Sequence, residues 1–383
     1  MEGVAKIKSF IITSIIRIFN CLPIRNNKIF LYSYYGSQYG CSPKYISEYI
    51  VKNYPDKYDI VWAFNDVKSK ESIQGIRKVK IMSLKYFYEL CTSKVIITNF
   101  RTTETFKKRN NQYYIQTWHS SLRLKQIEKD AEDTLPVHYI KMAKEDSKKL
   151  DLLISGCKFS TDIFKRAFWY DGEIFEHGTP RNDILVKSDS NLNDMVKEKL
   201  KIDKDKKIIL YAPTFRKNNN LEIYNIDYSK IINKLKDKFG GEWVFLVKLH
   251  PHLVSKSDEL VYGKYVLDVT KYDDIQELLS IADVLISDYS SLMFDFALTK
   301  KPCFLYVPDL DEYIENDRGL YFYINELPFI SVRNNDELAS EITNFDSDKY
   351  DKDLKSFSSK IGSFEIGKCS EELEKKISKV CFR

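Results

Sequence analysis

Short apolar runs alternate with helix-like stretches along most of the chain, and this alternation predicts the fold. In the first half, apolar or β-branched runs predict strands at residues 28–34, 59–64, 78–82, 95–99, 113–117, 151–155 and 173–176. Between them, stretches such as 43–54 and 83–92 have the spacing of helices. Strands that alternate with helices predict a parallel sheet that is covered on both faces.

The alternation lapses near residues 186–205, where the sequence becomes polar and rich in charge, and then it resumes. Second-half strands are predicted at 208–212, 243–249, 265–269, 284–286 and 303–307, with helices at 228–238, 273–281, 291–299 and 370–380. We therefore expect an α/β protein with two Rossmann-like, doubly wound domains, 26–190 and 191–383. For the last helix, packing against the first domain is the alternative.

The N-terminal stretch 9–22 is apolar, but polar residues interrupt it and lysines precede it. A helix that spans a bilayer requires about 20 apolar residues, and no small-residue cleavage site follows, so neither a spanning helix nor a signal peptide is predicted. Six apolar residues fall largely on one helical side: Phe10, Ile11, Ile15, Ile18, Phe19 and Leu22. We expect residues 1–25 to form a basic amphipathic helix in a membrane interface. Packing of this helix against the protein itself is the alternative.

Composition narrows the functional classes. Of the 383 residues, 43% are hydrophobic and 30% are charged, which is typical of a folded globular protein and not of a disordered one. A net charge of +5 without a basic-aromatic motif gives no reason to expect a nucleic-acid partner. The seven cysteines include no CxxC pair, so reduced thiols are predicted and a zinc site is not.

Polar and basic residues gather directly after the predicted strands. In doubly wound sheets ligands bind beyond the carboxyl ends of the strands, so these positions are candidates for chemistry. Four of the five histidines lie there, and the ordinary histidine pKa of about 6.5 suits proton transfer near neutrality. They are His119, His177, His250 and His252, whereas His138 has no such context and is interpreted as structural.

The segment 286–295 (ISDYSSLMFD) is the most informative of these strand ends. Two hydroxyls and a carboxylate stand where a buried strand turns into a helix, with Ser290 or Ser291 as the predicted N-cap. Free backbone N–H groups at such a turn favour an anion. A capped helix without a ligand is the alternative for this segment taken alone.

Basic side chains and hydroxyls at several strand ends are the groups that a diphosphate requires. The candidate ligand-binding residues are Arg181, Asn182, Thr214, Arg216, Lys248, Asp288, Ser290, Ser291 and Arg318. For Asp288, capping, an ion pair and a hydrogen bond to a substrate hydroxyl all stay open. There is no P-loop, GxGxxG or HExxH motif and no carboxylate cluster with metal-ligand spacing, so no cofactor and no metal are predicted.

Several of these segments also stand in the order found in a known family. Between residues 28 and 330 they are Thr117-Trp118-His119, 178–183 (GTPRND), 211–216 (YAPTFR), Leu249-His250-Pro251, 287–291 (SDYSS), Tyr313 and Arg318-Gly319. As a set they resemble the CDP-glycerol glycerophosphotransferases of teichoic-acid and capsule-like polymer synthesis. The family often continues its first motif as His-Gly-Thr-Pro, whereas here Ser120-Ser121-Leu122 follows His119.

The resemblance implies a GT-B-type pair of domains facing a central cleft, in a protein held peripherally at the cytoplasmic face of a bacterial membrane. It implies transfer of a polyol phosphate from CDP-glycerol or CDP-ribitol to a lipid-linked acceptor of the undecaprenyl-diphosphate type, with release of CMP. By the same resemblance, His119 is the base that activates the acceptor and His250 lies near the donor phosphates. Ser290, Ser291 and Arg318 are then expected to contact those phosphates.

Two further interpretations stay open. One is a GT-B nucleotide-sugar glycosyltransferase or epimerase, which would release UDP and not CMP. The other is a non-catalytic protein that binds the donor within a polymer-assembly complex. Because both His119 and His250 are present, the enzyme is the interpretation that we favour.

Overall fold

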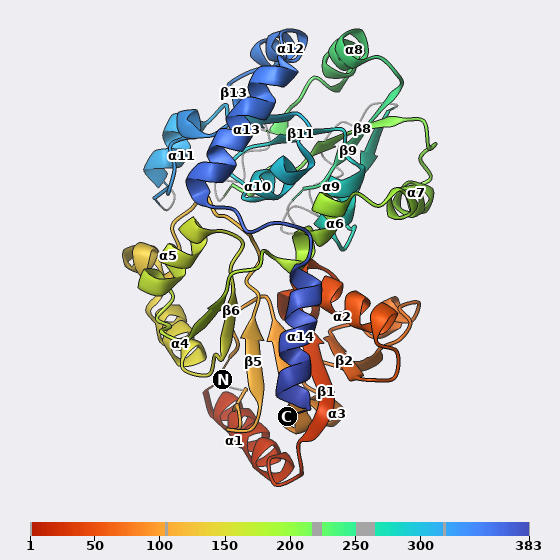
Figure 1. The fold of residues 1–383 in the computed structure, drawn as a ribbon. Coiled ribbons are helices and arrows are strands. Elements are labelled where there is room, and N and C mark those ends of the chain that lie inside the picture. The colour runs from red at the N-terminus through yellow and green to blue at the C-terminus, as the bar shows by residue number, and fades with distance from the viewer. Residues whose placement is uncertain (1, 104–105, 217–223, 250–264, 317–318, 383) are drawn as a thin grey trace. The chain divides into compact units, whose positions relative to one another are not determined.

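The computed structural model describes residues 2–103, 106–216, 224–249, 265–316 and 319–382, and it divides the chain into two compact units (Figure 1). Unit 1 comprises Met1–Ser121, Ile127–Asp183 and Phe364–Arg383, and unit 2 comprises Leu122–Gln126 and Ile184–Ser363. The main division therefore falls at residues 183 and 184, where the sequence pattern placed it at 190 and 191. The C-terminal helix is part of unit 1.

Unit 1 is built on a seven-stranded parallel sheet in the order β3-β2-β1-β4-β5-β6-β7. All seven strands lie within three residues of their predicted positions: β1 Arg25–Tyr32, β2 Asp59–Phe64, β3 Arg77–Lys80, β4 Ser93–Thr98, β5 Tyr113–Gln116, β6 Leu152–Ile154 and β7 Glu173–Phe175. The order reverses direction at β1 and β4, as in doubly wound nucleotide-binding sheets. Consecutive residues of β1, such as Ile29, Phe30 and Leu31, are all fully buried because both faces of the sheet are covered.

Helices supply that cover in unit 1: α1 Glu2–Phe19, α2 Cys41–Asn53, α3 Leu84–Thr92, α4 Val137–Ser147, α5 Lys158–Ala167 and α14 Cys369–Cys381. The last of these comes from the far end of the chain and lies beside α2 over the sheet (Figure 1). Its residues Cys369, Leu373 and Ile377 belong to one core cluster with strands β1 and β2.

Unit 2 repeats the plan with a six-stranded parallel sheet in the order β10-β9-β8-β11-β12-β13. Its strands are β8 Lys207–Tyr211, β9 Trp243–Val247, β10 Val266–Asp268, β11 Val284–Ser287, β12 Cys303–Tyr306 and β13 Ile330–Val332, of which only the last was not predicted. Its helices are α7 Ser190–Lys199, α8 Tyr228–Phe239, α9 Ile275–Ile281, α10 Leu292–Phe296, α11 Leu310–Asn316, α12 Asn335–Thr343 and α13 Ser347–Ile361, and α6 Asp183–Lys187 begins at the division between the units. The α/β class with two parallel-sheet domains is thereby confirmed.

Helix α1 contacts α3 within unit 1. Ile16 is buried, and the Phe19 ring meets the Tyr88 ring edge-on with centroids 5.8 Å apart. Phe10 and Ile18 are 71% and 66% exposed, so these two apolar side chains of the helix remain largely unpacked against the rest of the chain. Among the described helices, none has both the length and the apolar character that a membrane crossing would need.

Candidate functional site

The loop after β5 holds His119 in a defined backbone conformation. Trp118 adopts a positive φ of 52°, which is uncommon for a bulky residue, and its N–H donates to Gln116 Oε1 at 2.9 Å. The Trp118 and His119 rings stack with centroids 4.5 Å apart. This turn buries Trp118 and leaves the His119 side chain exposed.

Two hydrogen bonds fix His119 further. The Arg181 guanidinium donates to the His119 carbonyl at 2.6 Å, and His119 Nδ1 lies 3.1 Å from the Asn99 carbonyl, after β4. A carbonyl only accepts, so this contact favours the neutral tautomer with the proton on Nδ1. Nε2 is then the basic nitrogen of the ring. The arrangement is therefore compatible with proton abstraction by His119.

The GTPRND segment that supplies Arg181 is held by the C-terminal part of the chain. Glu365 accepts hydrogen bonds from Thr179 N at 3.1 Å, from Thr179 Oγ1 at 2.8 Å and from Asn182 Nδ2 at 3.2 Å. Gly178 has a φ of +88°, and a Cβ there would lie 2.8 Å from a Glu365 carboxylate oxygen. Because Asn182 is fully buried in this network, its observed contacts shape the segment that presents Arg181.

In unit 2, Asp288 joins the ends of β11 and β8. Its carboxylate accepts from Thr214 N at 2.9 Å and from Thr214 Oγ1 at 2.6 Å, and it forms an ion pair with Arg216 at 2.9 Å. Asp288 is 2% exposed. Of the alternatives that the sequence left open for Asp288, the structure shows the ion pair.

Arg216 lies between two carboxylates and two aromatic rings. Its Nε donates to Asp309 Oδ2 at 2.6 Å, and its guanidinium carbon is 4.8 and 4.9 Å from the ring centroids of Tyr289 and Tyr313, which stack on each other. Burial raises the pKa of Asp309, but the hydrogen bond and charge of Arg216 outweigh burial, so this pKa lies below its ordinary value. The Arg216 side chain thus ties together the loops that follow β8, β11 and β12.

Lys248 follows β9 and is half-buried. Its ammonium group donates to the carbonyls of Thr270 and Tyr272, each at 2.8 Å. Burial lowers the pKa of Lys248 from its ordinary value of 10.5 to about 8, against the opposing effect of nearby aspartates. This lysine fixes the loop that follows β10.

Ser290 and Ser291 lie, half-buried, directly before α10. Ser291 occupies the predicted N-cap position, but its side chain makes no capping bond. Its Oγ accepts instead from Leu124 N at 3.2 Å. Since the oxygen acts as an acceptor there, the hydroxyl proton can still be donated to another group.

Leu124 belongs to the short segment Leu122–Gln126, which is part of unit 2 although the sequence on both sides of it is in unit 1. The segment pairs with residues 319–321: Tyr321 N donates to Leu124 O at 2.7 Å, and Gln126 N donates to Gly319 O at 2.8 Å. The residues that follow the His119 motif are therefore anchored beside the serine pair.

The structure thus brings together Thr214, Arg216 and Asp288 in unit 2, and it brings Arg181 to the His119 backbone in unit 1. His250 and Arg318 lie outside the described residues. Sequence reasoning did not single out Asp309 or Glu365. Asp309 follows the predicted strand 303–307, so the strand-end rule could have found it, whereas no local signal marks Glu365.

Comparison with known proteins gives a consistent result. Residues 14–379 match the family described as CDP-glycerol:poly(glycerophosphate) glycerophosphotransferase. The chain is 34% identical over 374 residues to a teichoic acid poly(glycerol phosphate) polymerase of Bacillus spizizenii, covering 94% of each chain. It is 33% identical to a teichoic acid glycerol-phosphate transferase of Staphylococcus aureus, covering 96% of this chain and 97% of the relative. It spans half of a longer poly(glycerol phosphate) polymerase of Staphylococcus epidermidis, at 34% identity.

Solved structures agree. The wall teichoic acid polymerase TagF superposes with a TM-score of 0.84 at 32% identity, over 99% of this chain and 96% of that one. A histidine-to-asparagine variant of TagF soaked with CDPG gives a TM-score of 0.82 at 33% identity, over 94% of this chain and 90% of that one.

Proposed function

Because the chain belongs to the CDP-glycerol:poly(glycerophosphate) glycerophosphotransferase family, a family of transferases, we propose that it transfers glycerol phosphate from CDP-glycerol to a lipid-linked acceptor. CMP is the second product. The names of the relatives and the CDPG-soaked TagF structure support the choice of donor. CDP-ribitol is the second donor to test, because ribitol-phosphate polymerases also match the chain, at 28% and 26% identity.

The reaction would begin at His119. An acceptor hydroxyl loses its proton to His119 Nε2 and attacks the β-phosphorus of the donor, and the bond between that phosphorus and the CMP oxygen breaks with its electron pair leaving on CMP. The contact of Nδ1 with the Asn99 carbonyl, at 3.1 Å, is the observation that carries this assignment. Arg181 acts as a positioning residue through the His119 carbonyl.

The donor phosphates would be held in unit 2 by Ser290, Ser291, His250 and Arg318. Phosphoryl transfer depends mainly on positioning the reactants and on stabilising negative charge, and hydroxyl, imidazole and guanidinium groups are suited to both tasks. Thr214, Arg216 and Asp288 are then walls of the donor site, since their polar atoms already bind one another and Asp309. Lys248 likewise supports the site, because its ammonium group binds a carbonyl of the loop after β10.

Attachment to the cytoplasmic face of the membrane is the remaining part of the proposal. The exposed apolar side chains of α1, among them Phe10, Ile11 and Ile18, support an interfacial helix. An acceptor with a lipid anchor would require such a position.

The test is release of CMP by the full chain, supplied with CDP-glycerol, CDP-ribitol or a UDP-sugar and a lipid-linked acceptor. Turnover by His119→Ala should fall by about 10²- to 10⁴-fold, the usual contribution of a positioned base, while CDP-glycerol affinity stays near normal. His138→Ala changes another exposed histidine and is the matched control. Release of UDP, or equal turnover by His119→Ala and wild type, would contradict the proposal.

A further inference from the structure

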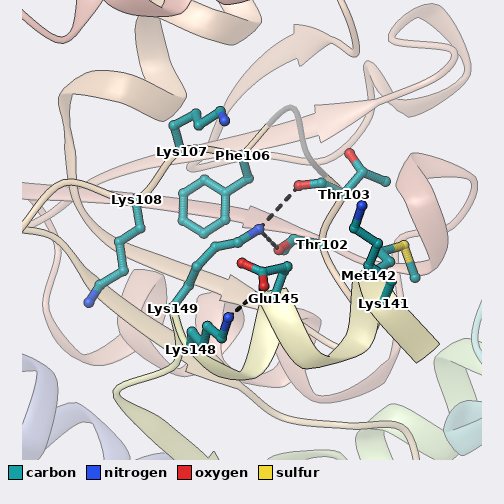
Figure 2. Close-up of a pocket in the computed structure, with 10 residues that line it drawn as sticks. All are labelled: Thr102, Thr103, Phe106, Lys107, Lys108, Lys141, Met142, Glu145, Lys148 and Lys149. Atoms are coloured by element: carbon teal, nitrogen blue, oxygen red, sulfur yellow. Dashed lines mark hydrogen bonds and ion pairs between the residues drawn. The ribbon is translucent and has the colours of Figure 1, made fainter. Parts of the chain in front are cut away.

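A pocket of about 390 Å³ lies in unit 1, and none of the candidate site residues lines it. Its described walls come from 102–103 and 106–108, between β4 and β5, and from 141–149 at the end of α4 (Figure 2). Among the described residues, five lysines line it, Lys107, Lys108, Lys141, Lys148 and Lys149, together with the acidic Glu145. The volume lies within the range of about 300–1,000 Å³ that is usual for ligand sites.

One residue that lines this lysine pocket, Thr102, belongs to a buried hydrogen-bonded network. Asp146 is fully buried, accepts from the backbone N–H and the hydroxyl of Thr102, and forms an ion pair with Arg101. Lys149 Nζ donates to Thr102 Oγ1 and to the Thr103 carbonyl, each at 3.2 Å (Figure 2). These contacts fix one ammonium group and two threonines in place before any ligand arrives.

The other four lysines add to the positive charge of the pocket, and two of them are in ion pairs. Lys148 pairs with Glu145 at 2.6 Å, and Lys108 pairs with Asp151 at 2.7 Å. Lys107 and Lys141 are exposed and form no ion pair with any residue that the structure describes. Among the described residues, the five lysines and their two carboxylate partners, Glu145 and Asp151, leave a formal charge of +3. A concave site with this charge and with hydroxyl groups is suited to a phosphate ester.

We propose that the lysine pocket binds phosphodiester groups of a glycerol-phosphate chain, away from the catalytic groups. The inference rests on the proposed function, because that reaction extends or starts such a chain. Lysines suit this ligand, since an ammonium on a flexible stem is a point charge that does not demand one orientation of the phosphate. Lysines from both walls of the pocket (Figure 2) can meet successive phosphates of one chain.

A soluble polyanion fits the lining better than a membrane surface does. Sites that dock on bilayers combine basic residues with exposed apolar side chains. Here Phe106 is buried and Met142 is half-buried, and none of the lining residues is an exposed large hydrophobic. The exposed apolar side chains of α1 lie on another element.

The test measures binding of a synthetic glycerol-phosphate hexamer to the full chain by calorimetry at low and at high NaCl. The double variant Lys107→Ala/Lys141→Ala should bind about 2- to 30-fold more weakly at low salt, from two exposed charge interactions, and the difference should shrink as salt rises. Lys238→Ala/Lys352→Ala removes two exposed lysines from unit 2 and the same net charge. This control should bind the hexamer like wild type.

Three results would overturn the inference: no binding of the hexamer by wild type, equal weakening in both double variants, or weaker binding of Lys107→Ala/Lys141→Ala to phosphatidylglycerol vesicles with unchanged affinity for the hexamer. Binding requires no turnover, so the outcome is independent of CMP release. If the protein binds the hexamer through these lysines but releases no CMP, the proposed function is refuted and the inference about the lysine pocket is retained.

Discussion

The Asp309→Asn substitution offers the sharpest test of the network in unit 2. Asp309 accepts hydrogen bonds from Arg216 Nε at 2.6 Å, from another Arg216 nitrogen at 3.2 Å and from the Tyr289 hydroxyl at 3.1 Å. Breaking a buried ion pair costs about 3–5 kcal/mol when the remaining charge has no other partner. Arg216 keeps Asp288 at 2.9 Å, and the new amide keeps one acceptor oxygen. We therefore expect a smaller loss in the free energy of local unfolding, about 2–3 kcal/mol.

Hydrogen exchange on peptides covering 208–216 and 284–291 measures this loss without assuming that both units unfold together. Amide exchange there should become about 30- to 160-fold faster, which is 2–3 kcal/mol expressed as a ratio. The matched control is Asp311→Asn, because Asp311 pairs with Arg333 at 2.8 Å while both side chains are more than half exposed. That exposed pair should be worth about 0–1 kcal/mol.

The same pair of proteins has a predicted pH dependence. The pKa of Asp309 in the folded protein lies below its ordinary value of 3.8. The stability that the carboxylate contributes is therefore present above about 3.8 and is lost as the pH falls through the folded pKa. The advantage of wild type over Asp309→Asn should shrink on acidification. Loss of protection no larger than in Asp311→Asn, or an advantage that persists in acid, would refute the reasoning.

Three further outcomes are expected. Glu365→Ala should lower kcat about 10- to 100-fold by displacing the loop that carries Arg181, with little change in affinity for CDP-glycerol; an unchanged kcat would remove Glu365 from this role. Lys248 has a folded pKa of about 8 against 10.5, so this lysine binds more protons in the unfolded chain between these values and its own contribution to the free energy of unfolding rises with pH across that window; the stability of wild type relative to Lys248→Met, followed by urea titration, should therefore rise between pH 8 and 10.5. Phe10→Glu with Ile18→Glu should reduce pelleting with anionic liposomes at least tenfold, whereas Met195→Glu, an exposed site on α7, should not.

The sequence could select individual strand-end residues of the candidate site. The rule that ligands bind beyond the carboxyl ends of parallel strands selected Thr214, Arg216 and Asp288 one by one. The structure brings them together because β8 and β11 are neighbours in the unit 2 sheet. Which atoms pair could not be read from the sequence, since Asp309 competes for the same guanidinium.

Local pattern alone determined the elements and the fold class. Continuous apolar runs specify strands that are buried on both faces. Such a strand can be predicted from the run itself and from the helical patterns beside it in the sequence. Of the thirteen strands in the described part of the chain, twelve were located in this way, and Ile330–Val332 was not. The division of the chain into two α/β domains also follows from local sequence, because the pattern lapses and then restarts.

Only the tertiary structure decided which distant residues share a network. Glu365 holds a loop more than 180 residues earlier in the chain, and Leu124 bonds to Ser291 from a segment whose flanks belong to the other unit. Such contacts depend on the order of strands in each sheet and on the packing of the C-terminal helix, and neither leaves a periodic trace in the sequence. The residue types at each strand end can therefore be read from the local sequence, whereas the residues that bind to them depend on long-range packing.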